Sequence, residues 1–246
     1  MIERGSPCDA DIQPETISKR LRWIESVIGE SSNLLMLDLG CGKGVYDQAL
    51  AKRGMRIIGI DFDAQSLAFC KVKNAFGGEY LRGVAESLPF NSGIFDAVIV
   101  IEVLEHVFDF EKTIVEISRV LKPGGILLST VPNRGFPFLT HGFHLGKKHF
   151  DNFFGFPLPL ATYLPLPLLR RIWLARHFRA AELNRSIEKA GLDVLDVRFL
   201  SPAFEIMGGA STNSGLAAWL RKIMRRFDLN PKFWPGMSIA THAIKK

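Results

Sequence analysis

The 246-residue sequence predicts an α/β fold with a mostly parallel β-sheet. Short apolar runs alternate with segments of helical periodicity along the chain, which is typical of βαβ units. One run, Phe95 to Ile101 (FDAVIVI), is continuously apolar, as strands buried on both faces of a parallel sheet are. Another run, Leu34 to Asp38, passes into three alternating glycines and then into a helical pattern. This order predicts the first strand, turn and helix of a nucleotide-binding sheet.

The remaining elements follow from periodicity and from residues that end helices. Residues 15–28 carry apolar residues at helical spacing and predict an amphipathic helix that covers the edge of the sheet. A helix over 110–121 stops at LKPGG, where proline and two glycines end it. We expect further strands over 55–61, 79–82, 125–131, 192–200 and 237–244, and further helices over 64–74, 181–190 and 216–227. Residues 1–14 are expected to form a flexible N-terminal arm, and residues 15–246 a single domain.

The composition favours a cytoplasmic globular protein. Apolar residues make up 47% of the chain, which is enough for a buried core. Cys8, Cys41 and Cys70 have neither the spacing of a disulfide framework nor that of a zinc site. No apolar run reaches the length of a membrane span, and the N-terminus lacks a signal-peptide core. A net charge of +6 is too small to imply nucleic acid by itself.

The glycine turn and a downstream acid predict an adenosine ligand. The glycines are spaced GxGxG, and Val45 stands where a dinucleotide-binding loop has its third glycine. This spacing disfavours a dehydrogenase, and the missing GK[ST] excludes a P-loop. Asp61 ends the second strand, 21 residues after Gly40, where a carboxylate can accept hydrogen bonds from both ribose hydroxyls.

Five motifs in this order resemble those of the class I S-adenosylmethionine-dependent methyltransferases, particularly the quinone-biosynthesis and small-molecule branch. The motifs are DLGCGKG (38–44), GID (59–61), VAESLPF (84–90), FDAVIVIEVLEHV (95–107) and LKPGG (121–125). The resemblance is close over residues 34–132. It implies a Rossmann-like, seven-stranded, mostly parallel sheet with helices on both faces and an antiparallel last strand. It also implies a lid inserted after strand five, at about residues 134–180.

The resemblance also implies which residues bind S-adenosylmethionine. The expected cofactor-binding residues are Asp38, Gly40, Cys41, Gly42, Asp61, Phe62, Ala85, Glu86 and Ile101. The glycine turn would line the methionine part, Asp61 the ribose, Phe62 and Ala85 the adenine, and Ile101 the sulfonium end. The family often has an adenine-binding acid where this chain has Val84. This departure leaves Glu86, a backbone carbonyl or packing alone to hold the adenine.

The stretch EVLEH follows the fourth strand, where substrates enter such sheets. His106 is a candidate catalytic base for a hydroxyl acceptor. Glu102, Glu105, His106 and His177 together resemble the metal site of small-RNA 2′-O-methyltransferases and suit Mg²⁺, Mn²⁺ or Zn²⁺. The alternative is a pair of structural acids and a hydrogen-bonded core histidine. Calorimetric titration of metal-stripped protein decides between them, because absence of binding by all three ions excludes the metal.

The segment 134–180 is expected to determine the acceptor. Residues 131–180 hold ten of the 26 aromatic residues, six of the 13 prolines and seven basic residues against one acid. This chemistry suits a hydrophobic lid, and it equally suits a surface that rests on anionic lipid together with the basic helix 216–227. The membrane hypothesis predicts more binding to anionic than to neutral liposomes, and equal recovery in both supernatants would exclude it.

The sequence as a whole predicts S-adenosylmethionine-dependent methyl transfer to a small, apolar or lipid-linked acceptor, preferably at oxygen. An RNA or protein methyltransferase ranks lower, because the basic residues mingle with apolar ones and no separate RNA-binding module is present. A non-catalytic S-adenosylmethionine-binding protein is the alternative from another class, and Val84 keeps it open. The identity of the acceptor and the oligomeric state are not specified by the sequence.

Overall fold

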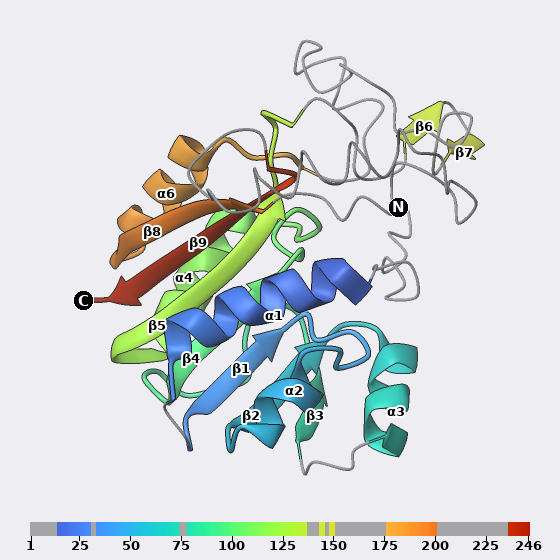
Figure 1. Ribbon diagram of the computed structural model, residues 1–246, viewed down its shortest axis with the longest axis vertical. Helices are drawn as coiled ribbons and strands as arrows, with labels where there is room; N and C mark the ends of the chain where they lie inside the picture. Colours follow the sequence, from blue (N-terminus) through green and yellow to red (C-terminus); the bar gives the residue numbers. More distant parts are fainter. Residues whose placement is uncertain are drawn as a thin grey trace, which may run out of the picture.

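The computed structural model describes residues 14–30, 33–73, 78–136, 143–145, 148–150, 176–200 and 236–246. Within these residues, seven strands form one sheet with the order β3-β2-β1-β4-β5-β9-β8 (Figure 1). The strands are β1 (Leu35–Leu39), β2 (Arg56–Asp61), β3 (Glu79–Arg82), β4 (Phe95–Ile101), β5 (Leu121–Pro132), β8 (Leu192–Leu200) and β9 (Ser238–Lys245). A separate hairpin consists of β6 (Phe143–Leu145) and β7 (Lys148–Phe150).

The direction of the strands confirms the predicted Rossmann-like fold. The pairs among β1 to β5 are parallel, whereas β9 runs antiparallel to both β5 and β8. The carboxyl ends of the parallel strands therefore lie at one edge of the sheet, and ligands of open α/β sheets bind at that edge. The residues that follow β1, β2 and β4 are thereby brought together.

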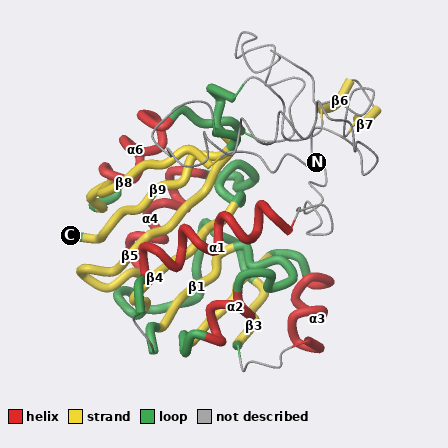
Figure 2. Tube along the Cα trace, in the orientation of Figure 1, coloured by secondary structure: helices red, strands yellow, loops and turns green. Residues whose placement is uncertain are grey.

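Helices cover both faces of the sheet (Figure 2). They are α1 (Pro14–Ile28), α2 (Asp47–Lys52), α3 (Ala64–Lys73), α4 (Phe110–Val120) and α6 (Ala180–Lys189). The helices α4 and α6 bury their apolar residues against one face of β4 and β5. On the other face, Trp23, Ile24 and Ile28 of α1 pack with residues of β1, β4, β5 and β9. The prediction that the first helix covers the edge of the sheet was therefore wrong, since α1 lies over the central strands.

The strand β5 begins four residues earlier than predicted. Leu121 pairs with Phe95 directly after α4 ends, and the register shifts before Ala97 pairs with Ile126. The LKPGG segment thus ends the helix, as predicted, while its first residue already belongs to the sheet. Gly124 takes a φ of 75° within this irregular segment.

The two ends of the predicted insertion lie side by side. The Arg134 N–H donates to the Phe178 carbonyl at 2.9 Å, and the Phe178 N–H donates to the Pro132 carbonyl at 3.0 Å. The chain between them contains the β6–β7 hairpin, and residues 137–142, 146–147 and 151–175 of the predicted lid lie outside the described residues. The same holds for residues 1–13 of the predicted arm and for the basic helix 216–227. Among the helices that the structure describes, none is long and apolar enough to cross a membrane.

Candidate active site

The glycine turn after β1 is held against β2 and against the loop after β4. The N–H groups of Gly40 and Cys41 donate to the Ile60 carbonyl at 2.7 and 3.2 Å. Gly40 has a φ of 75°, and a Cβ atom built on it would lie 2.3 Å from Cγ2 of Val103. Glycine is required here for two reasons, the left-handed backbone and the close approach of Val103.

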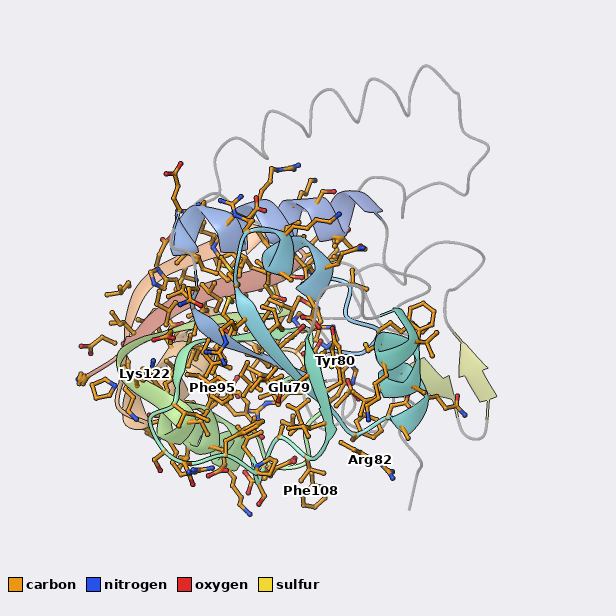
Figure 3. All side chains as sticks on the ribbon, turned by 90° about the horizontal axis from the view of Figure 1, so that it is seen from below. Glu79, Tyr80, Arg82, Phe95, Phe108 and Lys122 are labelled. Atoms are coloured by element: carbon orange, nitrogen blue, oxygen red, sulfur yellow. The ribbon has the colours of Figure 1, made fainter. Side chains whose placement is uncertain are left out.

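A largely buried polar cluster packs against the glycine turn at Gly44. A Cβ atom on Gly44 would lie 3.2 Å from Asp47 Oδ2, 3.2 Å from Cys70 Sγ and 3.3 Å from the Tyr80 hydroxyl. These three groups come from α2, α3 and β3 and therefore converge on one glycine; Figure 3 shows Tyr80 on its strand. Burial raises the pKa of the Asp47 carboxyl, and hydrogen bonding to Asp38 and Tyr80 only partly offsets this rise.

The substitution Asp47→Asn is expected to stabilise the protein by about 1–3 kcal/mol near neutral pH, the usual cost of a poorly compensated buried polar group. The folded protein holds the Asp47 proton more tightly than the unfolded chain does. Stability therefore falls as the pH rises from the unfolded pKa through the higher folded pKa, and asparagine removes this loss.

Urea denaturation between about pH 4 and about pH 8 measures the effect, which should be small at the acidic end and grow with pH. Asp193→Asn is the matched control, because Asp193 is an exposed carboxylate on β8. A stabilisation of the D47N variant that is the same at every pH would contradict the assignment.

Asp61 joins the end of β2 to the glycine turn. Its Oδ2 accepts from the Gly42 N–H at 2.8 Å, and its Oδ1 accepts from the Asp63 N–H at 2.8 Å. Each carboxylate oxygen has a second lone pair, so both retain the capacity to accept from a ligand hydroxyl. Phe62, the next residue, is 51% exposed although it is a large apolar side chain. A carboxylate and an exposed aromatic ring at the end of β2 suit a nucleoside.

The loop that resembles an adenine-binding segment, residues 83–92, is attached to the start of α4. Oε1 of Glu86 accepts from the N–H groups of Phe108 and Asp109 at 2.7 and 3.2 Å. Ala85 is half-buried and Val84 is 53% exposed. The Glu86 carboxylate thus binds backbone N–H groups at the start of α4, a contact that the sequence pattern did not indicate.

The loop after β4, residues 102–109 (the β4–α4 loop), contains a strained residue. Glu102 has a φ of 54°, which is unfavourable for a residue other than glycine. Its carboxylate pairs with Arg20 of α1 at 2.9 Å, and these side chains are 16% and 5% exposed. Arg20 also donates to Oγ of Ser238 in β9 at 3.3 Å. Strain of this kind persists where surrounding contacts impose it, and it is concentrated at functional sites.

The other two polar residues of EVLEH lie beside Glu102 in the same loop. Burial of Glu105 and the nearby charge of Glu102 raise the pKa of the Glu105 carboxyl well above its usual value. Nε2 of the half-buried His106 lies 3.8 Å from Oε1 of Glu105. The Arg176 N–H donates to the Glu105 carbonyl at 3.1 Å, so the chain that returns from the insertion borders this loop.

The four predicted metal ligands are all described, and His177 is buried next to Arg176. In the described part of the chain, no three carboxylate, imidazole or thiol groups converge closely enough to hold a metal ion. The Glu102 carboxylate pairs with the Arg20 guanidinium instead, and a metal ion would have to displace Arg20 from it. The side chains in this arrangement do not fit a metal, and the site stays a prediction for the titration described above.

Comparison with known proteins shows the family. A model of the methyltransferase domain matches residues 37–129, which include the glycine turn, Asp61 and the β4–α4 loop. A ubiquinone biosynthesis O-methyltransferase of Leptothrix cholodnii is 36% identical over 185 residues, which cover 73% of this chain and 72% of that protein. The chain belongs to the S-adenosylmethionine-dependent methyltransferases.

Two further proteins are similar to this methyltransferase. A ubiquinone biosynthesis O-methyltransferase of Pseudomonas aeruginosa is 32% identical, and 72% of each chain is covered. The crystal structure of an S-adenosylmethionine-dependent methyltransferase from Mesorhizobium loti has a TM-score of 0.63 at 16% identity and covers 92% of this chain and 98% of its own. The predicted fold, enzyme class and cofactor are thereby confirmed, whereas the roles of individual residues stay predictions.

Sequence reasoning missed Arg20, Asp47 and Tyr80 in the site of this methyltransferase. Arg20 could have been found, because it lies three residues after Ile17 and four before Ile24, on the apolar stripe of its helix. A long cation within an apolar stripe requires a buried partner. Tyr80 offers no such signal, because an aromatic residue in a strand is ordinary.

Proposed function

We propose that this methyltransferase transfers a methyl group to a hydroxyl oxygen of a small, lipid-linked phenol. The observation that carries the proposal is the identity with ubiquinone biosynthesis O-methyltransferases over most of both chains. The half-buried β4–α4 loop, with its carboxylates and an imidazole beside the glycine turn, supports it. When bound, S-adenosylmethionine supplies a methyl group on a sulfonium sulfur, which is already a good leaving group.

The residues after β1, β2 and β4 would bind the cofactor. Asp61 would accept from the ribose hydroxyls, and Phe62 with Ala85 would border the adenine. Gly40, Cys41 and Gly42 would contact the methionine part, with Asp38 behind them and Ile101 near the sulfonium. Arg20 is a buried, permanently charged group that interacts with Tyr46, shortly after this turn, and burial of the cofactor's carboxylate requires such a partner.

The β4–α4 loop would hold the acceptor. A phenol oxygen must lose its proton as the methyl group arrives, and His106 is the base proposed for that proton. Glu105 is buried whereas His106 is half-buried, so the imidazole is the more accessible of the two groups. The main contribution of the protein is orientation of the two substrates and exclusion of water between them.

Turnover with a matched pair of acceptors tests the proposal. The first acceptor is an isoprenoid-tailed catechol, and the second is the same molecule with both hydroxyls capped as ethers. We expect S-adenosylhomocysteine and methylated product in equal amounts from the first and neither from the second. Lack of turnover with the catechol, together with labelled methyl groups in RNA or protein, would contradict the proposal and favour the alternative acceptors.

An anionic membrane surface is proposed as a partner because lipid-linked acceptors reside in membranes. The supporting residues, the cations and apolar side chains of 134–180 and 216–227, lie largely outside the described residues. The comparison of anionic with neutral liposomes given above tests this point.

A further inference from the structure

The β4–α4 loop contacts both halves of the proposed cofactor site. Near its beginning, Val103 packs on Gly40 of the glycine turn. At its end, the Phe108 and Asp109 N–H groups are held by Glu86 of the 83–92 loop. The loop that carries Glu102, Glu105 and His106 is therefore attached to the ribose-methionine side at one end and to the adenine side at the other.

The attachment by Glu86 lies at the point where the loop becomes a helix. Asp109 is the N-cap of α4, and its side chain accepts from the Lys112 N–H at 3.0 Å. The N–H groups at a helix start have no partner within the helix, so an external carboxylate is a strong acceptor for them. Glu86 thereby holds the peptide that immediately precedes and enters α4. The side chain of Phe108, the residue whose N–H Glu86 binds, is 95% exposed and points outward in Figure 3. Packing of the Phe108 side chain therefore does not fix this peptide.

The 83–92 loop does not depend on Glu86 for its own position. Glu116 of α4 accepts from the Leu88 N–H at 2.8 Å, and Arg119 donates to the carbonyls of Leu88 and Phe90 at 3.0 and 2.7 Å. Hydrogen bonding to Arg119 lowers the pKa of the Glu116 carboxyl, as expected for a tightly paired acid. Removal of the Glu86 carboxylate therefore frees the end of the β4–α4 loop and leaves the adenine side in place.

We propose that Glu86 is a positioning residue that fixes the β4–α4 loop, and hence the acceptor, relative to the bound cofactor. The inference rests on the proposed function, since that function places the acceptor at this loop. It differs from the role expected from the sequence, in which Glu86 borders the adenine. A direct adenine contact would contribute to cofactor affinity, whereas a positioning residue contributes to the rate of transfer.

The test compares Glu86→Ala and Glu86→Gln with the wild-type protein. We expect kcat to fall about tenfold to a hundredfold in E86A, because small displacements of a reacting group have effects of this size. Glutamine keeps an oxygen that accepts hydrogen bonds, so E86Q should lie between E86A and the wild type. The Kd for S-adenosylhomocysteine should change by less than about twofold in both variants, since the groups that hold the 83–92 loop remain.

Amide hydrogen exchange is the second readout, with Glu79→Ala as the matched control on an exposed position of β3. Exchange at Phe108 and Asp109 should become faster in E86A and stay unchanged in E79A. A loss of S-adenosylhomocysteine affinity as large as the loss of kcat would overturn the proposal in favour of an adenine contact. Unchanged exchange at these amides, or unchanged kcat, would also overturn it. If the wild-type protein does not methylate the catechol, the proposed function fails, and exchange together with S-adenosylhomocysteine affinity still decides the role of Glu86.

Discussion

Replacing Arg20 with leucine is expected to lower the free energy of unfolding by about 3–5 kcal/mol, since removal of one partner leaves a buried charge without compensation. Arg20 connects α1 to the end of β4 through Glu102 and to β9 through Ser238, and both members of the ion pair are largely buried. The R20L variant should also lose most of its affinity for S-adenosylhomocysteine, because the proposed partner of the cofactor carboxylate is gone. Urea denaturation and calorimetric titration measure the two effects.

Arg53→Leu is the matched control for this prediction. Arg53 pairs with Glu25 at 3.3 Å, but the two side chains are 39% and 27% exposed. Exposed pairs contribute about 0–1 kcal/mol. Combining R20L with Glu102→Gln should recover much of the lost stability, because the second substitution removes the uncompensated charge. An R20L variant no less stable than R53L would show that the buried pair contributes little.

The substitution Gly40→Ala is expected to destabilise the protein by about 2–5 kcal/mol, and to weaken cofactor binding strongly. A left-handed conformation costs alanine about 1–2 kcal/mol, and overpacking in a rigid site adds about 1–3 kcal/mol. The added methyl group would overlap both Cγ atoms of Val103, at 2.3 and 2.8 Å. The turn or the β4–α4 loop must then shift. Chemical denaturation and titration with S-adenosylhomocysteine report the two losses.

The Gly124→Ala variant separates the two causes. Gly124 has the same φ of 75°, and nothing lies within 4 Å of a Cβ atom placed on it. The loss of stability in G124A therefore measures only the cost of the left-handed backbone conformation. In the G40A/V103A double variant, the shorter side chain at position 103 should remove the loss of stability caused by overpacking. The loss caused by the left-handed backbone should remain. Equal losses in G40A and G124A would contradict the close contact between Gly40 and Val103.

The fold was predictable because its signals are local. A continuous apolar run bounded by turn residues predicted β4 with both ends correct. The acids Asp38, the last residue but one of β1, and Asp61, the last residue of β2, marked the edge of the sheet where the site forms. The placement of the first helix was not predictable from its periodicity. An apolar stripe shows which side of a helix is buried, but it does not show which strands lie beneath it.

The candidate site likewise has a part that was predictable from the sequence and a part that was not. Asp61 and the glycine turn belong to one short βαβ unit, so their spacing in the sequence determines their proximity. The partners of Glu86 lie 22 and 23 residues away, and Ser238, a partner of Arg20, lies 218 residues away. Such contacts depend on the order of strands in the sheet, and a single sequence does not specify that order. Glu86 contacts the start of α4, which the sequence did not indicate, and its expected adenine contact stays a prediction.

A crystal structure of the methyltransferase with S-adenosylhomocysteine and the isoprenoid-tailed catechol tests the central claim most directly. The account predicts adenosine across the glycine turn and Asp61, with a catechol hydroxyl beside the β4–α4 loop and in line with the sulfur. A catechol bound without contact to any residue of 102–109 would contradict it.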